Sequence, residues 1–181
     1  MLRQIRSVRR SVPRPTLQTL VASLVLSKLD YGCATLAGLP ATLLDRLQSE
    51  LNAAARLIYG RRKYDQVTPL LRKLHWLRVP ERITFRLATL AYRCQHNMVP
   101  HYLASQLNQA SSVASRRRLH SVSTPELIVP RIPRSTIGDH VFCMTAARAW
   151  NTLTPSVQSS ESLAIFRRRL KTELFSRSFP D

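Results

Sequence analysis

The sequence predicts a mainly α-helical fold, a bundle-like set of helices with a long basic loop rich in Ser, Arg and Pro. Three observations predict it. The 181 residues include only 4 glycines against 11 prolines, so flexible glycine turns are scarce and prolines mark helix boundaries. Hydrophobic residues make up 44% of the chain, enough for a packed core. Apolar residues recur at three- and four-residue steps in several segments, as on one face of an α-helix.

The clearest helix is expected over residues 40–60. Gly60 is expected to end it in the left-handed conformation, and Arg56 lies in the last turn, where the helix dipole favours a cation. The helix therefore leads directly into a basic, aromatic loop, Arg61-Arg62-Lys63-Tyr64. Its apolar stripe is Leu43, Leu44, Leu47, Leu51, Ala54, Ala55 and Ile58.

Other helices are expected on both sides of this one. The first runs from Pro15 to about Gly38, with Leu17, Leu20, Val21 and Leu24 facing inward. A short helix begins at Thr68-Pro69 and ends at His75. A second strong helix runs from Pro80 to about Asn97, with Ile83, Leu87, Leu90, Ala91 and Cys94 as its stripe, and a short one from Pro100 to Leu107.

Composition divides the chain into four parts. Residues 1–15 form a basic leader, expected to be unstructured or an arbitrary start, and residues 16–107 form a helical region. Residues 108–138 form the Ser/Arg/Pro-rich loop, in which residues 127–129 are a candidate short strand. Residues 139–181 form a carboxy-terminal helical pair: Asp139 caps the first helix, and the second spans residues 162–176 with Leu163, Phe166, Leu170 and Leu174 inside.

Charge indicates the class of partner. The chain has 28 Lys and Arg against 10 Asp and Glu, a formal net charge of +18. Such a balance repels itself unless an anion is present, and the RNA or DNA backbone is the expected partner. An anionic membrane surface, an acidic protein and a merely solvated basic surface are the alternatives. No apolar stretch is long enough to span a membrane.

Arginine is suited to phosphate because its guanidinium is a planar, always charged, forked donor. Four candidate groups follow from this property: the loop after the central helix, a row at four-residue spacing along the second strong helix, an Arg cluster in the Ser/Arg/Pro-rich loop, and another in the last helix. A solvated face is the alternative for the row. The candidates are Arg61, Arg62, Lys63, Arg78, Arg82, Arg86, Arg116, Arg117, Arg118, Arg167, Arg168 and Arg169.

No catalytic site is expected, and no metal or cofactor. The ten acidic residues are scattered without a D-D, D-x-D or Y-x-D-D sequence, and neither a glycine-rich phosphate loop nor G-x-S-x-G occurs. The single metal-like cluster is Cys94, His96 and His101, which lacks a fourth ligand, and Cys94 fits the apolar stripe of its helix. Three separated cysteines without C-x-x-C indicate a reducing compartment.

The first 14 residues allow a second interpretation. They contain five arginines, no acidic residue precedes Asp30, and Leu2, Ile5 and Val8 share a helical face, as in a mitochondrial transit peptide. The basic bias continues along the whole chain, however, which favours an arbitrary start within a basic protein. Localisation stays open: nuclear or cytoplasmic, with mitochondrial as the alternative.

A series of short segments resembles, in order, the carboxy-terminal part of LINE-type (non-LTR) retrotransposon reverse transcriptases of jockey-like and related clades. The segments are Val25–Gly32, Gly38–Pro40, Leu47-Gln48, Asn52–Ile58, Arg62–Asp65 with Thr68-Pro69, Leu74–Leu77 with Val79, Arg82-Ile83 with Phe85, Pro100 with Tyr102-Leu103, Arg116–Leu119, Gly138-Asp139 with Phe142, Ala149–Asn151 with Leu153 and Pro155, and Phe166-Arg167 with Leu170-Lys171. The resemblance covers about residues 20–176.

The resemblance implies a truncated element. In that family the catalytic palm with its Y-x-D-D motif lies upstream, so no catalytic residue carries over to this chain. What remains is similar to the thumb-side and carboxy-terminal helical region, which supports the polymerase and holds template RNA or target DNA. The missing upstream reverse transcriptase domains are then further partners. An active polymerase, a mitochondrial nucleic-acid-binding protein and a translated relic without function are the rival hypotheses.

Overall fold

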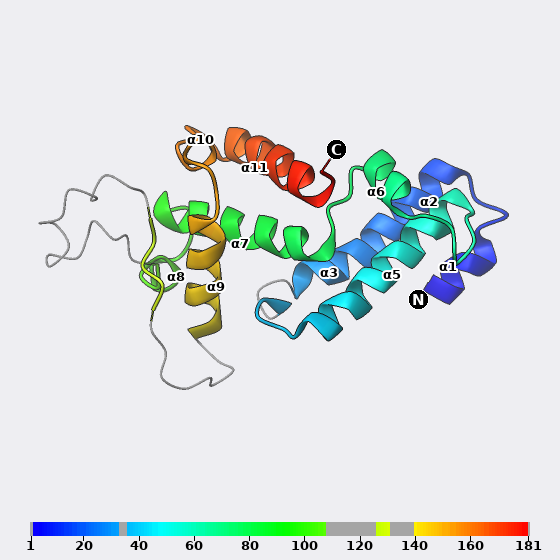
Figure 1. The fold of residues 1–181 in the computed structure, drawn as a ribbon, viewed down its shortest axis with the longest axis horizontal. Coiled ribbons are helices and arrows are strands. Elements are labelled where there is room, and N and C mark those ends of the chain that lie inside the picture. The colour runs from blue at the N-terminus through cyan, green and yellow to red at the C-terminus, as the bar shows by residue number, and fades with distance from the viewer. Residues whose placement is uncertain (1, 33–35, 108–125, 131–139, 181) are drawn as a thin grey trace, which may run out of the picture. The chain divides into compact units, whose positions relative to one another are not determined.

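The computed structural model describes residues 2–32, 36–107, 126–130 and 140–180, with the side chains of residues 140 and 141 left out. The described residues are mainly helical and contain no strand, which confirms the predicted fold class (Figure 1). They form two compact units. Unit 1 comprises residues 1–83 with 174–181, and unit 2 comprises residues 84–173. This division differs from the one expected from composition, because two long helices each pass from one unit into the other.

Unit 1 is built on the central helix α5. This helix spans Ala41–Tyr59 and ends at Gly60, which adopts the left-handed conformation with φ 66°, as the sequence predicts. The other elements of unit 1 are α1 (Leu2–Val8), α2 (Arg14–Val21), the π-helical turn η1 (Ala22–Leu26), α3 (Ser27–Tyr31), α6 (Thr68–Leu74), the start of α7 (Val79–Gln95) and the end of α11 (Leu163–Ser178). Helices α2 and α6 both pack against α5.

The stripe predicted for α5 is buried only over its second half. Leu51, Ala54, Ala55 and Ile58 are buried, as expected. Leu43 is 38% exposed, and Leu44 and Leu47 are partly exposed. The carboxy-terminal half of α5 therefore carries the core of unit 1.

The first long helix differs from the prediction in its middle and at its end. It is continuous from Arg14 to Tyr31, but η1 widens the turn at residues 22–26. A π turn shifts the phase of the following side chains, so Val25 and Leu26 are buried whereas Leu24, predicted to face inward, is 41% exposed. The helix ends at Tyr31 instead of about Gly38, which itself has φ 86°.

The amino-terminal leader also differs from the expectation of an unstructured segment. Residues Leu2–Val8 form α1, and Ile5 is buried. Helix α1 packs against α2. The turn that follows it places Arg9 and Arg14 beside the end of α5.

Unit 2 contains most of α7 and α11, with α8 (His101–Ala104), α9 (His140–Asn151) and α10 (Pro155–Gln158). Its core is a row of stacked rings. The centroids of Tyr92 and Phe166 lie 4.5 Å apart, and those of Trp150 and Phe166 lie 5.8 Å apart. All three side chains are essentially fully buried, and the Tyr92 hydroxyl donates to the carbonyl of Ser160 at 2.9 Å. Trp150 is thus a core residue.

The boundaries of α6, α7 and α11 agree with the sequence to within a few residues. Phe166, Leu170 and Leu174 are buried on α11, as expected, although Leu163 is partly exposed. Residues 127–129, the candidate strand, form no sheet among the described residues. The expected cap Asp139 and the candidate residues Arg116, Arg117 and Arg118 lie outside the residues that the structure describes.

Candidate nucleic-acid interface

The loop after α5 is held in a defined turn. The N–H of Arg61 donates to the carbonyl of Arg56 at 2.9 Å, which closes the helix end behind Gly60. The Arg56 Nε donates to the carbonyl of Asp65 at 3.0 Å, and the N–H of Arg62 donates to Oδ2 of Asp65 at 2.9 Å. Asp65 therefore organises the turn by accepting from the backbone of residue 62.

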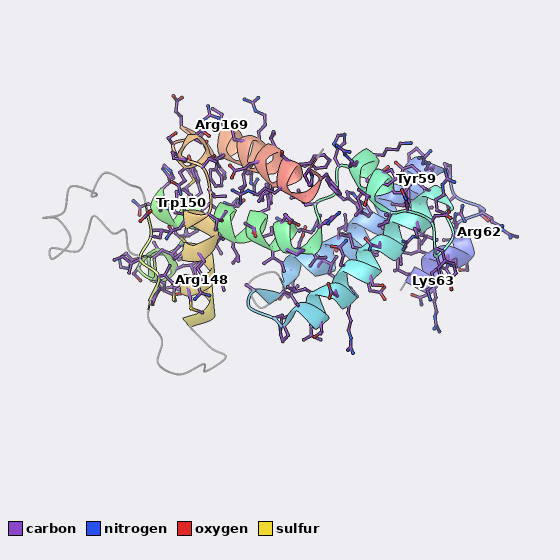
Figure 2. All side chains as sticks on the ribbon, viewed as in Figure 1. Tyr59, Arg62, Lys63, Arg148, Trp150 and Arg169 are labelled. Atoms are coloured by element: carbon purple, nitrogen blue, oxygen red, sulfur yellow. The ribbon has the colours of Figure 1, made fainter. Side chains whose placement is uncertain are left out.

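This turn presents its basic side chains to solvent. Arg61, Arg62 and Lys63 are exposed, and Tyr64 is 91% exposed. The Nζ of Lys63 lies 5.9 Å from the centre of the Tyr64 ring. Figure 2 shows Arg62 and Lys63 at the same end of unit 1 as Tyr59. A cationic surface with an exposed ring is a common arrangement for contacting nucleic-acid phosphates and bases.

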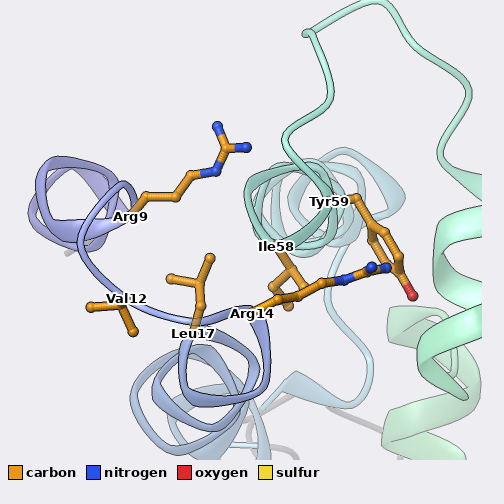
Figure 3. Close-up of a pocket in the computed structure, with 6 residues that line it drawn as sticks. All are labelled: Arg9, Val12, Arg14, Leu17, Ile58 and Tyr59. Atoms are coloured by element: carbon orange, nitrogen blue, oxygen red, sulfur yellow. The ribbon is translucent and has the colours of Figure 1, made fainter.

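Two arginines from the leader join this surface. The guanidinium carbon of Arg14 lies 4.1 Å from the centre of the Tyr59 ring, a cation–π contact. The guanidinium of Arg9 lies against Gly60, where an added Cβ would overlap its Nη2. Both arginines line a pocket of about 270 Å³ (Figure 3). We call the surface formed by Arg9, Arg14, Tyr59, Arg61, Arg62 and Lys63 the basic corner.

Sequence reasoning misses three members of the basic corner. It places Arg9 and Arg14 in a leader without structure, and it treats Tyr59 only as part of the helix. The sequence does contain signals for the two helices that carry these arginines. Apolar residues at helical spacing in residues 2–8 predict the first helix, and a proline begins the next one. The sequence does not reveal that this pair of helices packs beside the end of α5.

The three arginines predicted to form a row along α7 differ in their surroundings. Arg82 forms a two-pronged ion pair with Asp30, with Nε–Oδ1 at 2.6 Å and Nη2–Oδ2 at 3.0 Å. Both side chains are largely buried, so the Arg82 guanidinium is occupied by Asp30 and is not presented to a phosphate. Arg78 lies over the Phe179 ring, with its guanidinium carbon 5.4 Å from the ring centre. Arg86 is exposed, in unit 2.

The three candidate arginines of α11 also differ in their surroundings. The Nη1 of Arg169 donates to the carbonyl of Ser156 at 2.8 Å and approaches the Ser160 hydroxyl at 3.5 Å, so this side chain ties α10 to α11. Arg168 is exposed. Arg167 is half-buried, and its Nε has no hydrogen-bond partner among the described residues. A single row of three equivalent arginines is therefore absent from the described part of α11.

The cysteine of the metal-like cluster is packed in unit 2, whereas His96 and His101 are exposed. Cys94 is buried, and its thiol approaches the carbonyl of Leu103 at 3.9 Å. Burial raises the pKa of the Cys94 thiol above its usual value, which disfavours the thiolate that metals bind. The ring of His96 lies 4.1 Å from that of Tyr92. Within the described ranges, no three His, Cys, Asp or Glu side chains lie together as a metal site would require.

Comparison with protein-family models, with curated proteins and with solved structures finds no match to this chain. Among the described helices, none is both long and apolar enough to cross a membrane.

Proposed function

We propose that the chain is a non-catalytic, helical nucleic-acid-binding module, related to the carboxy-terminal part of LINE-type reverse transcriptases. The observation that carries the proposal is the basic corner. It gathers five cationic side chains and a tyrosine from two segments of unit 1, α1–α2 and the end of α5. This arrangement suits a phosphate backbone, and the exposed ring of Tyr64 beside the basic corner is available to stack on a base.

Charge supports the same proposal. Asp65 is the acidic residue nearest in sequence to the loop, and its carboxylate accepts a hydrogen bond from a backbone N–H of the loop. Asp30 is the first acidic residue of the chain, and it is paired with Arg82. Neither is among the residues that line the pocket. The positive potential at the corner is therefore compensated best by a polyanion from outside the chain.

The proposal predicts steeply salt-dependent binding. Fluorescence anisotropy of the whole chain with labelled single-stranded RNA of about 20 nucleotides, longer than a usual single-domain site, measures the affinity at increasing salt. We expect log affinity to fall by roughly 0.7 per phosphate contact for each tenfold rise in salt. The same titration with DNA of the same sequence compares the two partners, because phosphate contacts do not distinguish them.

Two outcomes would contradict the proposal. A flat salt titration would mean that phosphates are not the ligand. Primer extension by the purified chain on an RNA template would mean that the chain is a polymerase and not a non-catalytic module. Neither experiment requires the upstream domains of the related enzymes.

A further inference from the structure

The fold leaves the ring of Tyr64 almost entirely to solvent. This residue is 91% exposed, and its hydroxyl makes no hydrogen bond among the described residues. The nearby Tyr59, by contrast, is partly buried, with the Arg14 guanidinium carbon 4.1 Å from its ring centre. An exposed aromatic ring forgoes the free energy that its burial would supply. The ring of Tyr64 is therefore available to a ligand.

Hydrogen bonds hold the turn that carries this ring. The N–H of Asp65 donates to the carbonyl of Arg62 at 3.2 Å, and Oδ2 of Asp65 accepts from the N–H of Arg62 at 2.9 Å. The Arg56 Nε donates to the Asp65 carbonyl at 3.0 Å, which ties the turn to the end of α5. A tyrosine has only two side-chain torsions, so a ring on a fixed turn loses little freedom when it stacks on a ligand.

The charges around the ring suit a phosphate chain. Arg61, Arg62 and Lys63 directly precede Tyr64, and all three side chains are exposed. The Lys63 Nζ lies 5.9 Å from the ring centre, near the outer limit of a cation–π contact, so the ammonium leaves the ring open. The acidic neighbour Asp65 uses one carboxylate oxygen inside the turn. Cations and an open ring on one turn can hold the phosphates and a base of the same strand.

The flanking cations distinguish Tyr64 from other exposed tyrosines. Tyr31, at the end of α3, and Tyr102, on α8, are also largely exposed. Neither has a Lys or Arg within two positions in the sequence, and Asp30 directly precedes Tyr31. Exposure alone therefore does not mark a nucleic-acid contact in this chain, whereas exposure on a cationic turn does.

We propose that Tyr64 stacks on an unpaired base of a nucleic-acid strand whose phosphates are held by Arg61, Arg62 and Lys63. In a duplex, neighbouring base pairs cover the faces of the bases, so this contact requires a single strand, a loop or a bulge. The inference rests on the proposed function and names its substrate class, which is strands with unpaired bases. Because every base has an aromatic face, the contact is expected to depend little on sequence.

Strands with and without bases test the proposal on the unmodified chain. Fluorescence anisotropy compares a labelled single strand of mixed sequence with an abasic strand of equal length, in whichever of RNA and DNA binds more tightly. The two strands carry the same phosphates, so a difference in affinity measures contacts with the bases. We expect the strand with bases to bind at least about fivefold more tightly, the lower end of what stacking one base contributes. Equal binding of the two strands would overturn the proposal.

Three variants assign the base contact to this ring. Tyr64→Leu removes the aromatic face and is expected to weaken binding of the strand with bases about fivefold or more, while leaving the abasic strand unaffected. Tyr64→Phe keeps the face and should bind as the unmodified chain does. Tyr31→Leu is the matched control, because Tyr31 is an exposed tyrosine of unit 1 outside the basic corner. Equal weakening by the control, or equal weakening of both strands by Tyr64→Leu, would overturn the assignment.

A fully paired duplex tests the requirement for unpaired bases. The duplex is long enough that few of its binding positions lie at an end. Tyr64→Leu should leave the affinity for this duplex unchanged, because the duplex offers the ring no free base. A loss as large as that for the single strand would overturn the proposed preference for unpaired bases.

Failure of this inference can be told apart from failure of the proposed function. If the strands with and without bases bind equally and with a steep salt dependence, base stacking is wrong and binding to the phosphate backbone stands. If neither strand binds, the proposed nucleic-acid function is wrong and the base contact is wrong with it.

Discussion

The guanidinium of Arg9 rests against Gly60, so the turn after α1 and the end of α5 form one surface. This contact depends on glycine for two reasons. Gly60 has φ 66°, a backbone conformation that residues with a Cβ rarely adopt. In addition, a Cβ added at this position would overlap Nη2 of Arg9. The glycine that ends α5 is therefore also the residue against which Arg9 of the basic corner rests.

Gly60→Ala is expected to lower stability and to displace Arg9. The left-handed conformation costs an alanine about 1–2 kcal/mol, measured as the loss in free energy of urea unfolding. The matched control is Gly38→Ala, since Gly38 also has positive φ but a Cβ added there would meet no other group within 4 Å. Binding of labelled single-stranded RNA should weaken in the Gly60 variant only. Equal binding by both variants would contradict the contact with Arg9.

The ion pair between Arg82 and Asp30 is expected to stabilise unit 1 without contributing to nucleic-acid binding. Its two bonds and its burial predict a coupling free energy of about 0.5–3 kcal/mol in a double-mutant cycle of Arg82→Ala and Asp30→Ala. Urea unfolding of the four proteins measures it, with exposed Lys28→Ala as the control for the single variants. Additive effects of the two substitutions on the free energy of unfolding would contradict the coupling. A smaller salt dependence of nucleic-acid binding in Arg82→Gln would mean that Arg82 does contact phosphate.

The side chain of Asn151 is expected to hold residues 126–130 on unit 2. Its Oδ1 accepts from the N–H of Leu127 at 2.9 Å, and its Nδ2 donates to the Leu127 carbonyl at 2.8 Å. Asn151→Ala removes both bonds and should cost about 1–3 kcal/mol of stability, because Leu127 is buried. Asn151→Asp keeps the acceptor and loses the donor.

Amide hydrogen exchange separates these two variants. The Leu127 N–H should stay protected in Asn151→Asp and exchange faster in Asn151→Ala. If the amide is equally protected in both variants, the Asn151 side chain is not what secures this segment.

Burial of Cys94 predicts a loss of stability at alkaline pH. Desolvation raises the pKa of its thiol in the folded chain, so above about pH 8.5 the unfolded chain releases this proton first. The folded state then binds more protons, and its stability falls as pH rises from the unfolded pKa towards the folded one. Between pH 7 and about pH 10, the free energy of urea unfolding should fall more for the unmodified chain than for Cys94→Ala. Equal losses would contradict the prediction.

Local sequence signals are sufficient for most helices. Gly60 ends α5, Thr68-Pro69 begins α6, and the stripes of α7 and α11 are largely buried as their periodicity predicts. These features depend on residues within a few positions of each other. The division into two units is not predictable in this way, because it places residues 174–181 with the first part of the chain.

The candidate site is predictable only in part, for the same reason. Arg61, Arg62 and Lys63 follow a predictable helix end and are exposed, as a phosphate contact requires. Arg82 has the same helical spacing as its neighbours, and only the fold shows that Asp30 occupies its guanidinium. Arg9 and Arg14 depend on how α1 and α2 pack. Spacing along one helix does not reveal partners that come from another.

We propose that the basic corner, and not net charge alone, binds nucleic acid. The most direct measurement compares the salt slope of RNA binding for two double variants that each replace one Arg and one Lys: Arg62→Gln with Lys63→Gln, and Arg46→Gln with Lys28→Gln. All four residues are exposed in unit 1, and the second pair lies outside the basic corner. We predict that the first pair lowers the slope by about 1.4 and the second leaves it nearly unchanged. Equal reductions in both would contradict the account, because binding would then follow total charge.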